Sequence, residues 1–576
     1  MLGWRARIRL TVDVAVLCYG LALTSSAQTT RHGEEASTLR GTVLNSVTHE
    51  PVGRALVYSP DNRFATFADA SGRFEFRFAA SETGQKGASN EVTVQGGRSI
   101  ASAERPSMLM ARKPGFITPD GNQNVVLAQN QTDLTIYLVP EALIVGHVNL
   151  PGSDGSDKVQ VELFRRQVRD GRAHWDSLNT VTTRSDGEFR FADLQPGTYK
   201  LLTHEQLDRD PLTFDPRGQL YGYPPVYFPA ANNFAAATAI QVTAGTTFQA
   251  NFSPTRHEYY PVDIAVTNMS EGEGLSVSVF SGEKGPGYSL GYNPSEQKIQ
   301  GILPDGTYTV EVGSFGPTQG AGLATITVGG GLARGQTITV VPNGGIPVNV
   351  TQEFTQTENT NTSGVLGTSF VSTGGVVTRG RPLNVYLESA DEYGQGRTAS
   401  LRQPKGPDDD SIYLENVQPG RYWVRADAVR GYVASVRSGG TDLLHHPLVV
   451  PLGGSSTPIE ITLRDDSAQL EGTLEGIPAS PAAIEGPQAP TAHIYLLPLP
   501  ESSGLFREVW TSPGEKFSAL GIPPGEYRVL AFDHPRPDLE YRNEQAMRKY
   551  ESKGQVIRLL PGQKERVRLH VISEND

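Results

Sequence analysis

A run of aromatic residues in the segment YGYPPVYFP is the part of this sequence best suited to hold a ligand. It contains Tyr221, Tyr223, Tyr227 and Phe228, and its prolines keep the backbone extended. Aromatic faces stack on pyranose rings, and neighbouring polar groups set specificity. We therefore predict a carbohydrate-binding site here, with Trp175 of AHWDSL as a further platform. The alternative is that these rings cover one end of a domain or pack against the next domain.

A His-x-x-Glu spacing, which zinc carboxypeptidases use, occurs at His32 and Glu35. A catalytic zinc also needs a third ligand and a rigid supporting shell. The surrounding segment QTTRHGEEAST has no apolar frame, and His147 and His174 fall in other predicted elements. We interpret the spacing as chance and expect no metal or other cofactor.

The segment GYSLG fits the Gly-x-Ser-x-Gly pattern, in which Ser289 would be a nucleophile. That pattern requires a strand before the serine and a helix after it. The residues that follow contain Pro294 and lack helical periodicity. We expect a glycine-rich hairpin loop instead.

Two further polar groups suggest metal ligands. His445 and His446 are adjacent, and neighbours on a strand face opposite sides, so they cannot easily share one ion. The acidic stretches GSDGSD (152–157) and PDDD (407–410) lack the spaced oxygen ligands and closing Glu of a calcium loop. We expect solvated loops at all three places.

A four-residue motif that occurs four times indicates the elements that position these residues. It consists of a proline or aspartate, a glycine, any residue and a tyrosine. The tyrosines are Tyr199, Tyr308, Tyr422 and Tyr527, which lie 109, 114 and 105 residues apart. The motif predicts a tight turn followed by a half-buried strand. A tyrosine at such a corner buries its ring while its hydroxyl reaches the backbone.

A period of this length fits a complete domain rather than a solenoid repeat. Opening strands (LRGTV, IVGHV, LEGTL) and alternating closing strands (such as LTIYLVP, IPVNVTQ and VRLHVIS) flank the motif in a fixed order. We predict an all-β chain of tandem immunoglobulin-like or transthyretin-like β-sandwich domains. The predicted domains are 36–140, 141–254, 255–352, 362–466 and 467–576, with linkers at 28–35 and 353–361.

One short helix is predicted in the last domain, in the segment PDLEYRNEQAMRKYESKG. Asp538 is its expected cap, Ala546, Met547 and Tyr550 share a face, and Gly554 ends it.

The composition limits the class of partner. A chain of 576 residues is too long for one core, and 37% hydrophobic residues with 62 glycines and 40 prolines suit a turn-rich β protein. The net charge of −12, without a basic block, speaks against nucleic acid and anionic membranes as partners.

The N-terminus predicts export. Arg5, Arg7 and Arg9 precede an apolar run over 10–23, and small residues allow cleavage after Ala27, so residues 1–27 read as a signal peptide. Cys18 is the only cysteine, so the mature chain should depend on its cores alone. No second long apolar stretch follows, and we expect a periplasmic, outer-surface or extracellular protein without a membrane span. Its oligomeric state is not indicated.

The order GTV, PVGRALVY, TFADASGRFEF and RKPGF resembles the carboxypeptidase regulatory-like domain, a transthyretin-like sandwich grouped by fold with starch-binding-like domains. The matching positions in the first unit are Gly41, Pro51, Val52, Ala55, Val57, Asp69, Gly72, Phe74, Pro114, Gly115 and Phe116. Those in the second unit are Gly146, Asp186, Gly187, Phe189, Pro196, Gly197 and Tyr199. The resemblance extends to exported multi-domain proteins of acidobacterial type. In metallocarboxypeptidases this domain lies beside the catalytic domain, so the resemblance implies no peptidase activity.

The sequence favours an exported, non-catalytic array of β-sandwiches that acts as a binding or scaffold module at the cell envelope, with an envelope protein or a glycan as partner. The second interpretation is a carbohydrate-binding protein that uses the aromatic residues of the second domain. An enzyme, either metallocarboxypeptidase-like or another hydrolase, ranks third because no candidate constellation fits its context. Exposed, coplanar rings would favour glycan binding, and buried rings would favour the scaffold.

Overall fold

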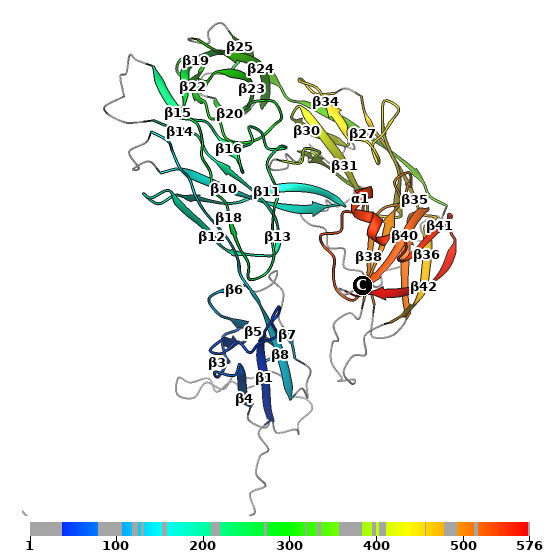
Figure 1. Cartoon of the computed structure of the whole chain (residues 1–576). Helices are drawn as coiled ribbons and strands as arrows, with labels where there is room; N and C mark the ends of the chain where they lie inside the picture. Colours follow the sequence, from blue (N-terminus) through cyan, green and yellow to red (C-terminus); the bar gives the residue numbers. More distant parts are fainter. Residues whose placement is uncertain are drawn as a thin grey trace, which may run out of the picture.

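Five β-sandwiches follow one another along the chain in the computed structural model (Figure 1). The structure describes residues 37–78, 106–117, 125–127, 132–152, 158–208, 219–269, 273–316, 319–330, 336–355, 383–393, 399–402, 411–455, 457–476, 492–511 and 516–573. Within these ranges all regular elements are strands except one short helix and the 3-10 turn that continues it. The predicted all-β class is confirmed.

In every sandwich the first strand lies beside a strand from the end of the unit and runs parallel to it; this is the last strand in four units and the last but one, β25 (Thr337–Thr339), in the third. On its other side, the first strand pairs antiparallel with a hairpin strand. The five parallel pairs are β1 (Ser37–Asn45) with β8 (Asp133–Pro140), β9 (Ala142–His147) with β18 (Thr247–Gln249), β19 (His257–Thr267) with β25 (Thr337–Thr339), β27 (Gly344–Glu353) with β35 (Ile459–Arg464), and β36 (Ala468–Glu475) with β42 (Lys564–Ile572).

The remaining strands complete two facing sheets in the first four units, whereas in the fifth the pairing of β40 (Gly525–Phe532) with β42 joins all strands into one sheet. In each unit the inward-facing residues meet in one apolar core. In the first sandwich the remaining strands are β2 (Leu56–Tyr58), β3 (Ala65–Phe67), β4 (Arg73–Phe78), β5 (Met108–Arg112), β6 (Phe116–Ile117) and β7 (Val125–Val126). In the second they are β10 (Gln160–Arg169), β11 (Arg172–Thr182), β12 (Glu188–Leu194), β13 (Gly197–Thr203), β16 (Val226–Tyr227) and β17 (Ile240–Val242).

The third and fourth units are built in the same way. The third contains β20 (Gly274–Phe280), β21 (Gly291–Asn293), β22 (Lys298–Pro304), β23 (Gly306–Phe315), β24 (Gly320–Val328) and β26 (Val341–Pro342). The fourth contains β28 (Leu383–Ser389), β29 (Ala399–Ser400), β30 (Tyr413–Val417), β31 (Gly420–Ala428), β32 (Tyr432–Ser438), β33 (Thr441–Asp442) and β34 (Leu448–Val450). The fifth contains β37 (His493–Pro498), β38 (Arg507–Trp510), β39 (Lys516–Ile522), β40 (Gly525–Phe532) and β41 (Gln555–Leu559).

The glycine of the opening strand makes room for an aromatic ring of the neighbouring hairpin strand. Gly146 is paired with Phe189, and a methyl group at Gly146 would lie 2.6 Å from the Phe189 ring and 1.7 Å from the carbonyl oxygen of Ala250. Gly41 and Gly472 meet phenylalanine rings of their own units in the same way. Glycine in these strands is therefore required by close approach and not by backbone conformation.

The four repeated tyrosines form the predicted corners. Each ring is buried, and each hydroxyl donates a hydrogen bond to the carbonyl oxygen four residues earlier. The donor–acceptor distances are 2.6 Å for Tyr199, 2.9 Å for Tyr308, 3.0 Å for Tyr422 and 2.6 Å for Tyr527. The packing role predicted for these residues is confirmed.

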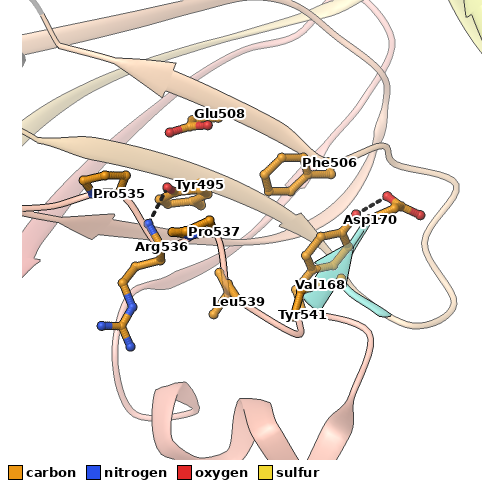
Figure 2. A pocket seen from close by; sticks show the side chains of 11 residues that line it. Val168, Asp170, Tyr495, Phe506, Glu508, Pro535, Arg536, Pro537, Leu539 and Tyr541 are labelled. Atoms are coloured by element: carbon orange, nitrogen blue, oxygen red, sulfur yellow. Dashed lines mark hydrogen bonds between the residues drawn. The ribbon is translucent and has the colours of Figure 1, made fainter. Parts of the chain in front are cut away.

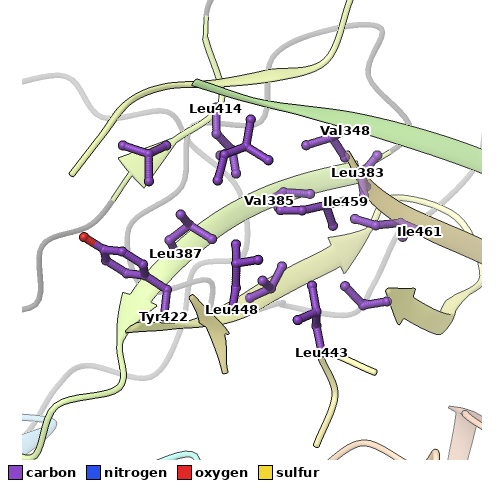
Figure 3. Packing of buried hydrophobic residues seen from close by; sticks show 14 of the residues in the cluster. Val348, Leu383, Val385, Leu387, Leu414, Tyr422, Leu443, Leu448, Ile459 and Ile461 are labelled. Carbon is purple, nitrogen blue, oxygen red and sulfur yellow. The ribbon is translucent and has the colours of Figure 1, made fainter. Parts of the chain in front are cut away.

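The strand predicted to close the third unit instead opens the fourth. β27 pairs with β30 and β35, and its Ile346 and Val348 are buried in the fourth core (Figure 3). The third unit closes with β25, so the boundary lies near Asn343 and not at residue 352. The physical reason is that an alternating strand pattern specifies a buried face but not the sheet that covers it.

The helix is shorter than predicted and has a different cap. α1 spans Glu544–Met547, and the 3-10 turn Arg548–Tyr550 continues it. Asn543, and not Asp538, accepts hydrogen bonds from the backbone at the start of α1. Tyr550 is buried and Met547 packs beside it, as the predicted apolar face requires.

The second sandwich connects the later units. Its extension β14 (Gln206–Leu207) and β15 (Leu220–Tyr223) joins the sheet of the third unit through β19. Its long hairpin β10–β11 reaches across to the fourth and fifth units near α1, while the first sandwich lies at the far end of the molecule (Figure 1).

Candidate functional site

Two of the predicted carbohydrate-binding tyrosines are buried structural residues. Tyr223 is 2% exposed and donates a hydrogen bond to the carbonyl oxygen of Pro151 at 2.8 Å. Tyr227 is 4% exposed and donates to the carbonyl oxygen of Pro286 in the third sandwich. Neither ring offers a face to solvent for stacking on a sugar.

The other two residues of the segment are also covered. Phe228 packs on Phe248 and Phe252 in the second core, with ring centroids 5.9 and 5.7 Å apart. The Tyr221 ring is half-buried beneath the guanidinium of Arg256, 4.1 Å from its centroid. This placement favours the packing alternative, and sugar binding by these residues stays a prediction.

Trp175 belongs to a buried cluster that joins two sandwiches, here called the aromatic junction. The second sandwich supplies four rings and the fourth supplies one. The five residues are Phe164, Trp175, Tyr227, Phe234 and Tyr393.

Phe234 contacts the other four rings of this junction, and Tyr393 contacts two of them. The ring centroid of Tyr393 is 5.0 Å from that of Phe234 and 5.5 Å from that of Phe164. The backbone takes part as well, because the Trp175 amide donates to the carbonyl oxygen of Glu392 at 2.6 Å. Burial raises the pKa of Tyr393 to about 12, so its hydroxyl stays protonated at neutral pH.

The side chain of a buried lysine, Lys200, places its ammonium group beside two rings of the same junction. The ammonium of Lys200 lies 4.9 Å from the Trp175 ring and 4.5 Å from the Phe234 ring, and it donates to the Phe234 carbonyl oxygen at 2.7 Å. Burial lowers the pKa of Lys200, while Glu392 and Glu283 oppose that change. The Lys200 ammonium therefore occupies the place among the rings of the aromatic junction that a ligand cation would take.

The tip of the β10–β11 hairpin carries a carboxylate that three arginines surround. Asp170 pairs with Arg425 of the fourth sandwich, with Arg542 of the fifth at 3.1 Å, and with Arg172 of its own hairpin at 3.0 Å. It also accepts a hydrogen bond from the Tyr541 hydroxyl. Burial alone would raise the pKa of Asp170, but Arg425 and Arg542 hold it below its usual value.

Further contacts extend this charged cluster. Arg425 also binds Glu388 at 2.7 Å, and Arg166 of the hairpin pairs with Glu540 of the fifth sandwich. Arg172 stacks on Trp423, with 3.5 Å between the guanidinium carbon and the ring centroid. Three sandwiches thus meet at one hairpin tip.

A cavity of about 300 Å³ opens between this hairpin tip and the fifth sandwich (Figure 2). Its walls are mostly aromatic, prolyl and aliphatic, with a few polar groups at the rim. They are formed by Val168, Asp170, Gly171, Tyr495, Phe506, Glu508, Pro535, Arg536, Pro537, Leu539 and Tyr541.

The rings of this cavity hold one another in place. Phe506 stacks face to face on Tyr541, with centroids 5.0 Å apart and planes 7° from parallel. Tyr495 is tilted beside Phe506 at 5.9 Å, and its hydroxyl accepts a hydrogen bond from the Arg536 amide at 2.9 Å. The Arg536 side chain points away from the rings, whereas the Glu508 carboxylate lies on their side of the cavity (Figure 2).

The remaining sequence candidates lie partly outside the described residues. His32 and Glu35 lie outside the described residues, as do 153–157 and 407–410. Ser289 is in a loop before β21 and no helix follows it, so the nucleophile geometry is absent there.

The two adjacent histidines lie in a turn rather than on a strand. His445 bridges Asp442 at 2.9 Å and the carbonyl oxygen of Ser502, in the fifth sandwich, at 3.1 Å. Among the described residues, no group of three or more His, Cys, Asp or Glu side chains is arranged to hold a metal. In the same residues no helix is long and apolar enough to cross a membrane.

The charged hairpin tip is a feature of the structure that the sequence did not indicate. The segment RDGR contains an Asp-Gly pair, and Asp170 and Gly171 have φ values of 44° and 70°. Asp-Gly with two positive φ angles is typical of a tight hairpin turn, so the turn itself can be predicted from the sequence. The partners of Asp170 cannot be predicted in this way, because they lie in other domains.

No family model matches this chain, so the resemblance to the carboxypeptidase regulatory-like domain stays a prediction. No curated protein matches either. Among solved structures, the Bacillus anthracis TIE protein is 10% identical over 75% of this chain and 74% of its own, with a TM-score of 0.14. The streptococcal ancillary pilin is 11% identical over 56% of this chain and 99% of its own, with a TM-score of 0.17.

The pilus adhesin SpaC from Lactobacillus rhamnosus GG, in its open conformation, is 12% identical over 53% of this chain and 43% of its own, with a TM-score of 0.16. The TM-scores of these three similarities are too low to carry an argument about function.

Proposed function

We propose that this chain is an exported, non-catalytic binding scaffold of the cell envelope, and that the cavity beside the hairpin tip is its ligand site. One observation carries the proposal: the walls of the cavity come from two sandwiches, and a half-buried ion network fixes them against each other. A preorganised, mostly apolar concavity with a few polar groups is the usual form of a small-ligand site.

The groups at the cavity favour binding over chemistry. Asp170 is occupied by three guanidiniums and a tyrosine hydroxyl, and its pKa is lowered, so it is poorly suited to hold or release a proton near neutral pH. Glu508 contacts the Nδ1 atom of His493 at 3.0 Å. An acid and a base free to face a substrate are what a hydrolase would need.

The ligand class that fits best is a neutral sugar ring at the end of a glycan. The half-buried ring of Phe506, which the buried Tyr495 and Tyr541 hold in place, provides aromatic surface for the apolar face of a pyranose, and the Glu508 carboxylate accepts hydrogen bonds from hydroxyl groups. An anionic ligand is disfavoured because the Arg536 guanidinium points away from the rings (Figure 2).

A glycan-array screen of residues 28–576 tests this proposal. The key variant is Phe506→Ala, which removes one wall of the cavity, and the matched control is Phe67→Ala, whose ring is 69% exposed on the first sandwich. We expect specific glycan signals that fall at least tenfold in Phe506→Ala and persist in Phe67→Ala. Signals that are equal in both variants would place the ligand elsewhere, and no signal from the intact chain would overturn the glycan class.

A further inference from the structure

We propose that the aromatic junction is an exchangeable docking site, which a second copy of this chain fills with its own residues 389–393. The inference goes beyond ligand binding, because it concerns how copies of the chain assemble. It rests on the way in which the fourth sandwich is attached to the second.

The docked segment is held as an added strand is held on a sheet edge. β11 lies at the edge of its sheet, and Trp175 forms a parallel bridge with Tyr393 there. The Trp175 amide donates to Glu392, and the Tyr393 ring enters the pocket between Phe164 and Phe234. A backbone bond plus a side-chain anchor is a recurring mode of recognition for extended segments, and it does not require that both partners belong to one chain.

The chain crosses from the third to the fourth sandwich through a very short connection. β26 ends at Pro342 and β27 starts at Gly344, so Asn343 alone separates them, and Gly345 follows. A rotation about this point moves the fourth and fifth sandwiches away from the second together. The two are joined to each other by His445, which contacts Ser502, and by Leu505 of the fifth, which packs against the fourth core.

Exchange of the fourth and fifth sandwiches between two copies would keep the contacts that these units make with the second sandwich within one chain. The third sandwich stays with the second, and the other partners of the second sandwich named above lie in the units that would move: Tyr393 and Arg425 in the fourth, Glu540 and Arg542 in the fifth. The junction and the charged cluster therefore re-form between copies with the same chemistry. Docking within one chain is favoured by high effective concentration, so the exchanged form is expected to rise with protein concentration.

A complementation experiment tests this directly. One copy carries Tyr393→Ala, which removes the anchor, and the other carries Phe234→Ala, which damages the pocket. Each variant lacks an intact junction by itself. Only a mixed pair can form one, from the Tyr393 of one copy and the Phe234 of the other.

With a different affinity tag on each variant, we expect the mixed pair to co-purify at least tenfold more than two tags on the same variant. Equal recovery of mixed and same-variant pairs, with both variants folded by circular dichroism, would overturn the proposal.

A second measurement covers the case in which a variant fails to fold. Wild-type chains with two different tags are held together at high concentration and then separated by size. We expect a dimer that carries both tags and whose fraction increases with concentration. A monomer at every concentration would also overturn the proposal.

Discussion

The carboxylate of Asp170 pairs with the guanidinium of Arg425, although the two residues are 255 positions apart and lie in different sandwiches. Arg172 and Arg542 face the same carboxylate, so one negative charge separates three positive charges. The contact closes the later sandwiches around the hairpin of the second and at the same time forms part of the cavity wall.

Replacing Asp170 with Asn is expected to destabilise this closed arrangement by about 3 kcal/mol, because removing one partner of a buried ion pair leaves the others uncompensated. Hydrogen exchange of β10–β11 should show faster opening of the hairpin. Salt should stabilise the variant, since it screens the repulsion among the arginines, and should weaken the wild type. Asp176→Asn, on the same hairpin but in a more exposed pair, is the control and should change stability by less than about 1 kcal/mol.

Glu205 predicts a pH dependence at the seam between the second and third sandwiches. Burial raises its pKa from 4.5 to about 7, and the nearby Tyr259 hydroxyl offsets part of that effect. Since the folded chain holds this proton more tightly, its contribution to stability is complete below pH 4.5 and is lost as the pH rises through 7. The loss amounts to about 3 kcal/mol.

Urea unfolding at several pH values measures this effect. Glu205→Gln should remove the dependence and should be more stable than the wild type at about pH 8. Glu188→Gln, whose side chain is 61% exposed, serves as the matched control and should keep the wild-type profile. An unchanged profile in Glu205→Gln would contradict the assignment.

Tyr527→Phe tests the corner hydrogen bond. It removes the hydroxyl that donates to the carbonyl oxygen of Pro523 and leaves the ring in place. A loss of about 1 kcal/mol in the free energy of unfolding is expected. Tyr137→Phe, at a ring that is 45% exposed in the first sandwich, should have no effect by the same thermal or denaturant measurement.

Gly146→Ala tests the close approach in the opening strand. The added methyl group would overlap the carbonyl oxygen of Ala250 and the Phe189 ring, so β9 must shift from β18 or β12. We expect a loss of about 3 kcal/mol or more in denaturant unfolding. Gly291→Ala, where the new methyl group would meet only an ordinary contact at 3.8 Å, should stay within about 1 kcal/mol of the wild type.

How far the sequence predicts this molecule depends on how local each interaction is. The Tyr527 corner closes over four residues, so its turn chemistry is sufficient to predict it. The residues of β27 alternate clearly, yet the same pattern fits the third or the fourth sheet, and only the partner strands decide. Asn543 replaces Asp538 as the helix cap because Glu540 and Tyr541, which follow Asp538, contact the hairpin of the second sandwich and the helix begins only after them.

The candidate site was harder to predict for the same reason. Tyr227 and Trp175 have the composition of a sugar-binding surface, and nothing within the second domain shows that other sandwiches cover them. Phe506 and Tyr541 stack across a loop of the fifth domain, and only the hairpin of the second domain completes their cavity. Contacts between domains leave no periodic signal in the sequence.

The parallel first and last strands have a consequence for a chain that is pulled from its two ends. The chain enters each sandwich at one end and leaves at the other, so tension slides the two strands along each other and loads their hydrogen bonds together in shear. Seven residue pairs join β36 to β42, and six join β1 to β8 and β27 to β35. Three join β9 to β18, but that seam continues through the parallel bridge of Val148 with Phe252, whereas only three join β19 to β25, so under force the third sandwich should yield before the others.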